Sequence, residues 1–202
     1  NIKDDEVRSR VDEEVSPRAG FIYKPQENIS LYISYSESFL PRSGEQYANI
    51  NGENNQLDPD TFTNREVGVK WDFAETLSFT AAMFENKQSS PQTADNDPAT
   101  LDVIDSQIEG FEMQLLGQLN ERFSFSVNFS QLDGEIVNRS GGTGLTPREL
   151  PESTYSAWAQ YVLNDRAGVS LGLTYQDESF INNSNSAVLP SYTRIDLAGY
   201  YE

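Results

Sequence analysis

The chain has no cysteine and no histidine among its 202 residues, and it has no long apolar run. Without cysteine there is no disulfide framework and no thiolate site. Without either residue, the common zinc sites and the Ser-His-Asp and Cys-His catalytic arrangements cannot be assembled. No run of about 18 apolar residues exists, which excludes a spanning helix but not a spanning barrel, whose strands need only about 9–11 residues each.

Basic residues are also scarce, with 14 Lys and Arg against 32 Asp and Glu and a formal net charge of −18. Such a balance makes nucleic acid an unsuitable partner, and we expect most of the acids to lie in solvated loops. A pair of carboxylates could act catalytically in principle, but no pair is marked out by the sequence. We therefore predict that the chain is not an enzyme. Its 37% hydrophobic and 11% aromatic content is too high for a disordered tail.

The clearest local pattern is strict alternation in the stretch 28–36. Ile29, Leu31 and Ile33 fall on one face of an extended chain, and serines and Tyr32 fall on the other. Similar alternation recurs along the chain and predicts nine strands, at 15–24, 28–36, 63–73, 76–86, 104–119, 123–130, 155–163, 169–176 and 190–202.

The connections between these predicted strands alternate strictly between short and long. The turns near Gln26, Ala74, Glu121 and Asp165 are short, and the four polar connections between them, at 37–61, 87–103, 133–151 and 177–189, are long. Short turns at one rim and long loops at the other are typical of an antiparallel, up-and-down transmembrane β-barrel. The glycines of the third connection, in 141–144, lack the Lys-Ser/Thr and the helix of a phosphate-binding loop.

A soluble β-sandwich, such as an adhesin-type binding module, is the alternative fold, because it also alternates apolar and polar residues. Two features favour the barrel. The connections sort into a short end and a long end, and aromatic residues such as Tyr35, Trp71 and Tyr175 concentrate at strand ends, as interfacial girdles require. A passive porin-like channel shares these features and stays open as an alternative function.

Several segments, taken together and in order, resemble the barrel domain of TonB-dependent siderophore receptors, especially the ferrichrome and catecholate branch. These segments are SPRAG at 16–20 with YKP at 23–25, LYISYS at 31–36 with PRSG at 41–44, FTNREVGVKW at 62–71, IEGFE at 108–112 and LPSYTRID at 189–196.

The resemblance implies an outer-membrane barrel of about 22 strands with an N-terminal plug, which takes up ferric siderophores with energy from TonB. Residues 1–202 would then be an internal part of the barrel domain, without the plug and the closing strands. The implied partners are a ferric siderophore, the TonB complex acting through the plug, and outer-membrane lipid. An isolated piece of this kind would expose two unpaired edges, along 15–24 and 191–201, and an apolar face, so we expect it to self-associate as an open curved sheet.

The siderophore itself ligates the iron in such a mechanism, so the resemblance implies no cofactor and no protein metal ligand. The ligand-binding candidates are Phe39, Arg42, Gln46 and Tyr47 in the first long connection, because aromatic faces and a cation suit an anionic or aromatic chelate.

Overall fold

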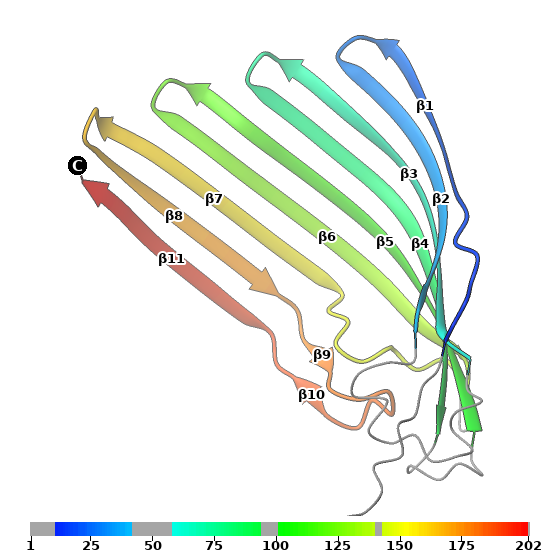
Figure 1. The fold of residues 1–202 in the computed structure, drawn as a ribbon. Helices are drawn as coiled ribbons and strands as arrows, with labels where there is room; N and C mark the ends of the chain where they lie inside the picture. The colour runs from blue at the N-terminus through cyan, green and yellow to red at the C-terminus, as the bar shows by residue number, and fades with distance from the viewer. Residues whose placement is uncertain (1–10, 42–57, 94–100, 140–142, 202) are drawn as a thin grey trace, which may run out of the picture.

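The computed structural model describes residues 11–41, 58–93, 101–139 and 143–201. Nine strands form one antiparallel sheet in which neighbours in sequence are neighbours in space, with the order β1-β2-β3-β4-β5-β6-β7-β8-β11 (Figure 1). Their bounds are β1 (Arg18–Gln26), β2 (Ile29–Leu40), β3 (Asp60–Ala74), β4 (Leu77–Thr93), β5 (Leu101–Asn120), β6 (Phe123–Asn138), β7 (Ser153–Asn164), β8 (Ala167–Gln176) and β11 (Tyr192–Tyr201). The predicted all-β, up-and-down topology is confirmed.

The sheet is a single curved layer, and its four tight turns all lie along one edge (Figure 1). Those turns join β1 to β2, β3 to β4, β5 to β6 and β7 to β8, and they fall where the sequence predicts them. The strand ends that lead into the long connections lie at the opposite edge, here called the mouth. In outer-membrane barrels the turn edge faces the periplasm and the mouth faces the outside.

Two of the four tight turns follow from local side-chain chemistry. The Oδ1 atom of Asn120 accepts the backbone N–H of Arg122 and of Phe123, at 2.9 and 3.0 Å. Asn164 repeats this arrangement with the N–H of Arg166, at 2.9 Å. Asparagine favours such turns because its side chain satisfies backbone groups that the strands leave unpaired.

The sheet lacks the core of a soluble protein. Among the described residues Ile136, at 0% exposure, is the one buried large apolar side chain, while Ile33 and Leu197 are 56% and 81% exposed. A sandwich would bury one face of each sheet against another, so the β-sandwich alternative is wrong. None of the described residues lies in a helix that could cross a membrane.

The strands extend further toward the mouth than the sequence predicts, and the predicted loop boundaries are wrong there. β2 continues to Leu40, β4 to Thr93 and β6 to Asn138, and β5 begins at Leu101. The fourth connection, predicted as a loop throughout, contains a small hairpin of β9 (Ser179–Phe180) and β10 (Val188–Leu189). β1 is the exception, because it begins at Arg18 rather than at Val15 and is therefore shorter at the mouth than predicted. Polar strands continue because the backbone ladder does not require an apolar face.

The two edge strands of the sheet, each with one side unpaired in the described part of the chain, are β1 and β11, as predicted. β1 pairs only with β2, and β11 pairs only with β8, among the described residues. The sheet is therefore an open, curved section of barrel wall.

Candidate functional site

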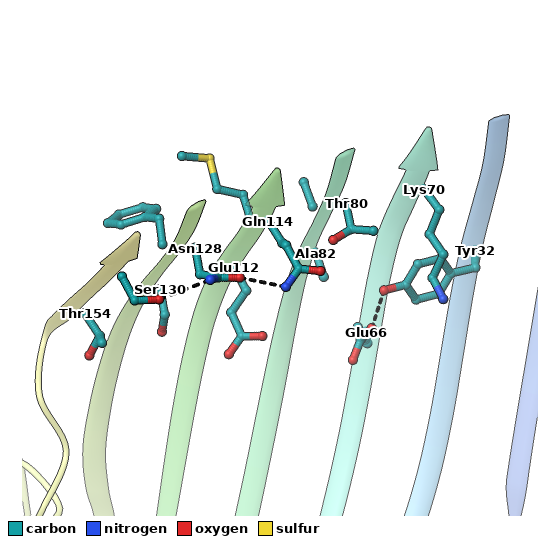
Figure 2. Close-up of a pocket in the computed structure, with 14 residues that line it drawn as sticks. Tyr32, Glu66, Lys70, Thr80, Ala82, Glu112, Gln114, Asn128, Ser130 and Thr154 are labelled. Atoms are coloured by element: carbon teal, nitrogen blue, oxygen red, sulfur yellow. Dashed lines mark hydrogen bonds between the residues drawn. The ribbon is translucent and has the colours of Figure 1, made fainter. Parts of the chain in front are cut away.

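The inner face of the sheet carries a row of polar side chains that crosses seven strands. Residues paired directly across antiparallel strands share a face. The register aligns Ser30, Lys70, Thr80, Gln114, Asn128, Ser156 and Thr174 on successive strands. The amide of Gln114 donates to Asn128 Oδ1 at 2.7 Å, and the amide of Asn128 donates to Ser156 Oγ at 3.1 Å. Figure 2 shows four members of this row, Lys70, Thr80, Gln114 and Asn128, projecting from neighbouring strands.

This row borders a hollow of about 530 Å³ that has charged groups on both sides. Tyr32 donates its hydroxyl to Glu66 Oε1 at 2.5 Å, and Lys70 Nζ lies 5.9 Å from the centre of the Tyr32 ring. Glu112 projects from β5 into the same space (Figure 2). Charges of both signs are costly against lipid and acceptable against water or a polar partner. The hollow therefore lies on the lumen side of the wall, and its chemistry is that of a polar binding surface.

Four inward-facing aromatic side chains cover glycines on adjacent strands. Tyr32 covers Gly68, Phe84 covers Gly110, Trp158 covers Gly172 and Tyr200 covers Gly168. A β-carbon on any of these glycines would lie 2.2 to 2.5 Å from the covering ring. These aromatic side chains lie flat along the wall and so leave lumen space open, an arrangement that only glycine allows.

The outward face shows the opposite chemistry. One row of apolar side chains aligns across five strands and consists of Phe21, Ile33, Val67, Met83 and Phe111. Toward the mouth this face carries aromatic rings in succession, with centroids 5.0 Å apart for Phe129 and Tyr155 and 5.8 Å apart for Tyr155 and Tyr175. Tyr175 donates its hydroxyl to Asp177 at 2.7 Å. An apolar band that ends in aromatic rings with polar tips is the membrane-facing pattern of outer-membrane barrels.

Charges resume on the outward face directly beyond this band. Arg65 Nη1 lies 3.4 Å from Glu85 Oε1, and Lys87 Nζ lies 3.5 Å from the same oxygen. The predicted inner and outer faces of the strands are confirmed by this division.

At the mouth, the described residues of the connection between β6 and β7 interlock with the connection 177–191. The backbone oxygen of Asn183 accepts a hydrogen bond from Arg139 Nη1 at 2.8 Å. The Oδ1 atom of the same residue accepts one from the backbone N–H of Arg148 at 2.9 Å. Asn185 exchanges two hydrogen bonds with the backbone of Thr146, at 2.9 and 2.8 Å. The N–H of Glu149 donates to the carbonyl of Phe180 at 2.7 Å.

The first of these connections also packs against the inner wall. The N–H of Ile136 donates to the carbonyl of Leu145 at 2.7 Å, and the N–H of Gly144 donates to the carbonyl of Ile136 at 2.9 Å. Leu150 and Pro147 lie over Gly134, where a β-carbon would be 2.3 Å from Leu150 Cδ2. Residues 143–152, here called the arm, therefore fold inward and narrow the mouth on this side.

Of the four ligand-binding candidates from the sequence, the structure places only Phe39. It pairs with Thr61 on the face of β2 that carries Ile33 and Tyr35, and it is half-buried. That face points outward, so Phe39 is not brought together with the polar hollow. Arg42, Gln46 and Tyr47 lie outside the described residues, and the assignment of all four stays a prediction.

Sequence reasoning missed the hollow and the interlocked arm. The polar residues at alternate positions of the strands, such as Glu66 and Gln114, were a signal for the hollow. Which of these residues lie side by side, however, depends on the register between strands. The interlock joins residues 35 to 44 positions apart, and no local pattern reports it. In the part of the chain that the structure describes, no group of three or more acidic side chains is arranged to hold a metal ion.

Comparison with known proteins identifies the wall. A family model described as the TonB dependent receptor-like β-barrel matches residues 2–202. The chain belongs to this family. It is 29% identical over 205 residues to a probable TonB-dependent siderophore receptor, PiuA, from Acinetobacter baumannii, with 93% of the chain and 28% of that protein covered. It is 27% identical over 193 residues to the ferrioxamine receptor of Yersinia enterocolitica, covering 94% of the chain and 26% of the receptor.

The fold comparison agrees. The crystal structure of the siderophore receptor PiuA from Acinetobacter baumannii matches with a TM-score of 0.80 at 30% identity, covering 91% of this chain and 29% of that one. The chain thus spans less than a third of the length of these relatives. Membership in the family assigns it to the barrel of a Gram-negative outer-membrane protein, and these relatives are transport receptors rather than enzymes.

Proposed function

We propose that this chain forms part of the barrel wall of a receptor that takes up a ferric siderophore across the outer membrane, with energy supplied through TonB. The observation that carries the proposal is the match of nearly the whole chain to the receptor barrel family, together with relatives named as siderophore and ferrioxamine receptors. The division of the sheet into an apolar outward face and a polar lumen face supports the same role.

The proposed mechanism assigns different tasks to the two levels of the wall. The mouth receives the chelate, and the polar hollow around Glu66, Lys70 and Glu112 faces the plug domain, through which TonB acts. Hydrogen-bonding groups on a curved wall suit a partner that must be held and later released, because each exposed contact contributes little alone. Iron travels inside the siderophore, so the wall supplies no metal ligand and needs no cofactor.

The test is uptake of radioactive iron by cells whose only receptor is the full-length protein that carries this chain. A panel of ferric hydroxamate and ferric catecholate chelates would be supplied in turn. We expect uptake of at least one chelate and its loss when TonB is deleted. Uptake that persists without TonB would instead identify a passive porin-like channel.

The same receptor tests the candidates in the first long connection. If Arg42 and Tyr47 both contact the chelate, the double variant Arg42→Ala, Tyr47→Ala should weaken binding by roughly 1–3 kcal/mol. Arg166→Ala is the control, because Arg166 lies in a turn at the opposite edge of the sheet. Unchanged chelate binding in titration would remove both residues from the site and leave the transport proposal standing.

Self-association of the isolated 202-residue chain is a further part of the proposal. The unpaired edges β1 and β11 and the exposed apolar face supply two routes for pairing with another copy. Sedimentation of the purified chain is the measurement, and a monodisperse monomer without detergent would contradict it.

A further inference from the structure

The inward-folded arm and the wall enclose a small pocket at the mouth, here called the mouth pocket, with a volume of about 200 Å³. Its wall side is built by three residues that the register aligns on the inner face, Gln88, Ser106 and Ile136. Its arm side is built by Arg148 and Asn183 from the two interlocked connections. The volume would hold roughly seven water molecules at about 30 Å³ each, which is the scale of one ring-sized chemical group.

Hydrogen bonds to the backbone of Arg148 and Glu149 hold the arm side of the mouth pocket in place. Asn183 Oδ1 accepts the N–H of Arg148 at 2.9 Å, and the next residue, Glu149, has a left-handed backbone with φ of 59°. The N–H of Glu149 is in turn bound to the carbonyl of Phe180 at 2.7 Å. These contacts fix the Arg148 backbone at the rim, and no carboxylate among the described residues pairs with its guanidinium.

The lining selects one kind of chemistry. Ile108, Ile136 and Leu150 supply an apolar surface that suits the face of a planar group, and Gln88 and Ser106 supply hydrogen-bonding groups. Among the described residues of the lining, Arg148 is the one that carries a charge, so this lining favours an anion over a cation. A guanidinium binds planar oxyanions in a forked geometry.

We propose that the mouth pocket binds a planar anionic group of the incoming chelate, a ring or carbonyl that carries an oxyanion, with Arg148 as its counter-ion. This inference rests on the uptake function proposed above and names the chemical class that the mouth selects. The pocket would hold one arm of the ligand against the wall, while the rest of the chelate lies in the lumen.

The test uses the full-length receptor in detergent and two small probes, the anion 2,3-dihydroxybenzoate and the uncharged catechol, followed by saturation-transfer NMR. We expect Arg148→Gln to weaken dihydroxybenzoate binding by about tenfold or more, and to leave catechol binding unchanged, because only the anion loses a charge-assisted hydrogen bond. Arg148→Lys should retain part of the affinity. Ser106→Leu, which fills the pocket from the wall, should abolish binding of both probes.

Arg166→Gln is the matched control, since it removes the same charge at the turn edge and should change neither affinity. Heat-modifiable mobility on gels would show that each variant barrel is folded. Equal affinities in the parent receptor, Arg148→Gln and Ser106→Leu, or no binding in the parent receptor, would overturn the assignment. A receptor that imports iron without binding either probe overturns this inference alone, whereas one that binds the probes but imports no ferric chelate overturns the proposed function.

Discussion

The outward and inward faces of this sheet are made by alternate residues of the same strands, and they solve different physical problems. The outward face is apolar over a band that ends in the Phe129, Tyr155 and Tyr175 rings. The inward face places hydrogen-bonded polar groups beside aromatic side chains that lie over glycines. Lipid requires an outward surface without charge, whereas the lumen requires space and polar groups. Two adjacent residues of one strand therefore meet opposite requirements.

The largest expected effect comes from placing a charge on the wrong face. Leu171 points outward from β8 and is 54% exposed, while Ser170, its neighbour, points inward and pairs with Gln160 and Ala198. Leu171→Arg should destabilise the full-length receptor in bilayers by about 2–4 kcal/mol, because the guanidinium would lie in the hydrocarbon region.

Ser170→Arg is the matched control and should cost far less, since the lumen side is hydrated. Urea unfolding of both variants in lipid vesicles is the measurement. Equal losses in the two variants would show that the assignment of faces on β8 is wrong.

A middle-sized effect is expected where an aromatic ring covers a glycine. A β-carbon at Gly110 would lie 2.2 Å from Phe84 Cζ, whereas one at Gly20 meets nothing nearer than the carbonyl oxygen of Ile33, at 3.6 Å. Gly110→Ala should therefore cost about 1–3 kcal/mol, the usual range for overpacking. Gly20→Ala, also on the inner face, should be neutral or slightly stabilising.

The cause can be checked in the Phe84→Ala background, where Gly110→Ala should lose most of its cost. Urea titration of the four receptors gives the coupling energy. An undiminished cost of Gly110→Ala without the ring would mean that the backbone, not Phe84, requires glycine.

Much of the membrane part of the wall could be predicted from the sequence, because there the two faces meet different solvents. Ile29, Leu31 and Ile33 alternate with polar residues for this reason, and two of the four tight turns carry an asparagine, Asn120 or Asn164, whose side chain accepts backbone N–H groups. Phe84 and Trp158 are apolar residues at inward positions, where the alternation would place polar ones. They lie there because each covers a glycine on the next strand, a pairing that requires knowledge of register.

The mouth could not be predicted in the same way. Beyond the apolar band both faces of the strands meet water, so the segments up to Thr93 and Asn138 lose their alternation while their backbones remain paired. The interlocked arm depends on Asn183 and Asn185, which join segments far apart in sequence. Asparagine-rich connections predict turns, but not the partner to which an asparagine is bonded.

The smallest expected effect concerns the hydrogen-bonded row on the inner face. Asn128 lies between Gln114 and Ser156, at 2.7 and 3.1 Å, and is half-buried rather than enclosed. Since water can replace a lost partner there, the coupling between Asn128→Ala and Gln114→Ala in a double-mutant cycle should be about 0.5–1.5 kcal/mol. Gln160→Ala, on the same face but outside this row, supplies the uncoupled control when combined with Asn128→Ala. Urea unfolding of the full-length receptor measures each corner of the cycle. A coupling near zero for Asn128 and Gln114 would mean that the row is a solvated surface, and the wall would then owe its inward stability to the glycine-covering rings and the backbone ladder alone.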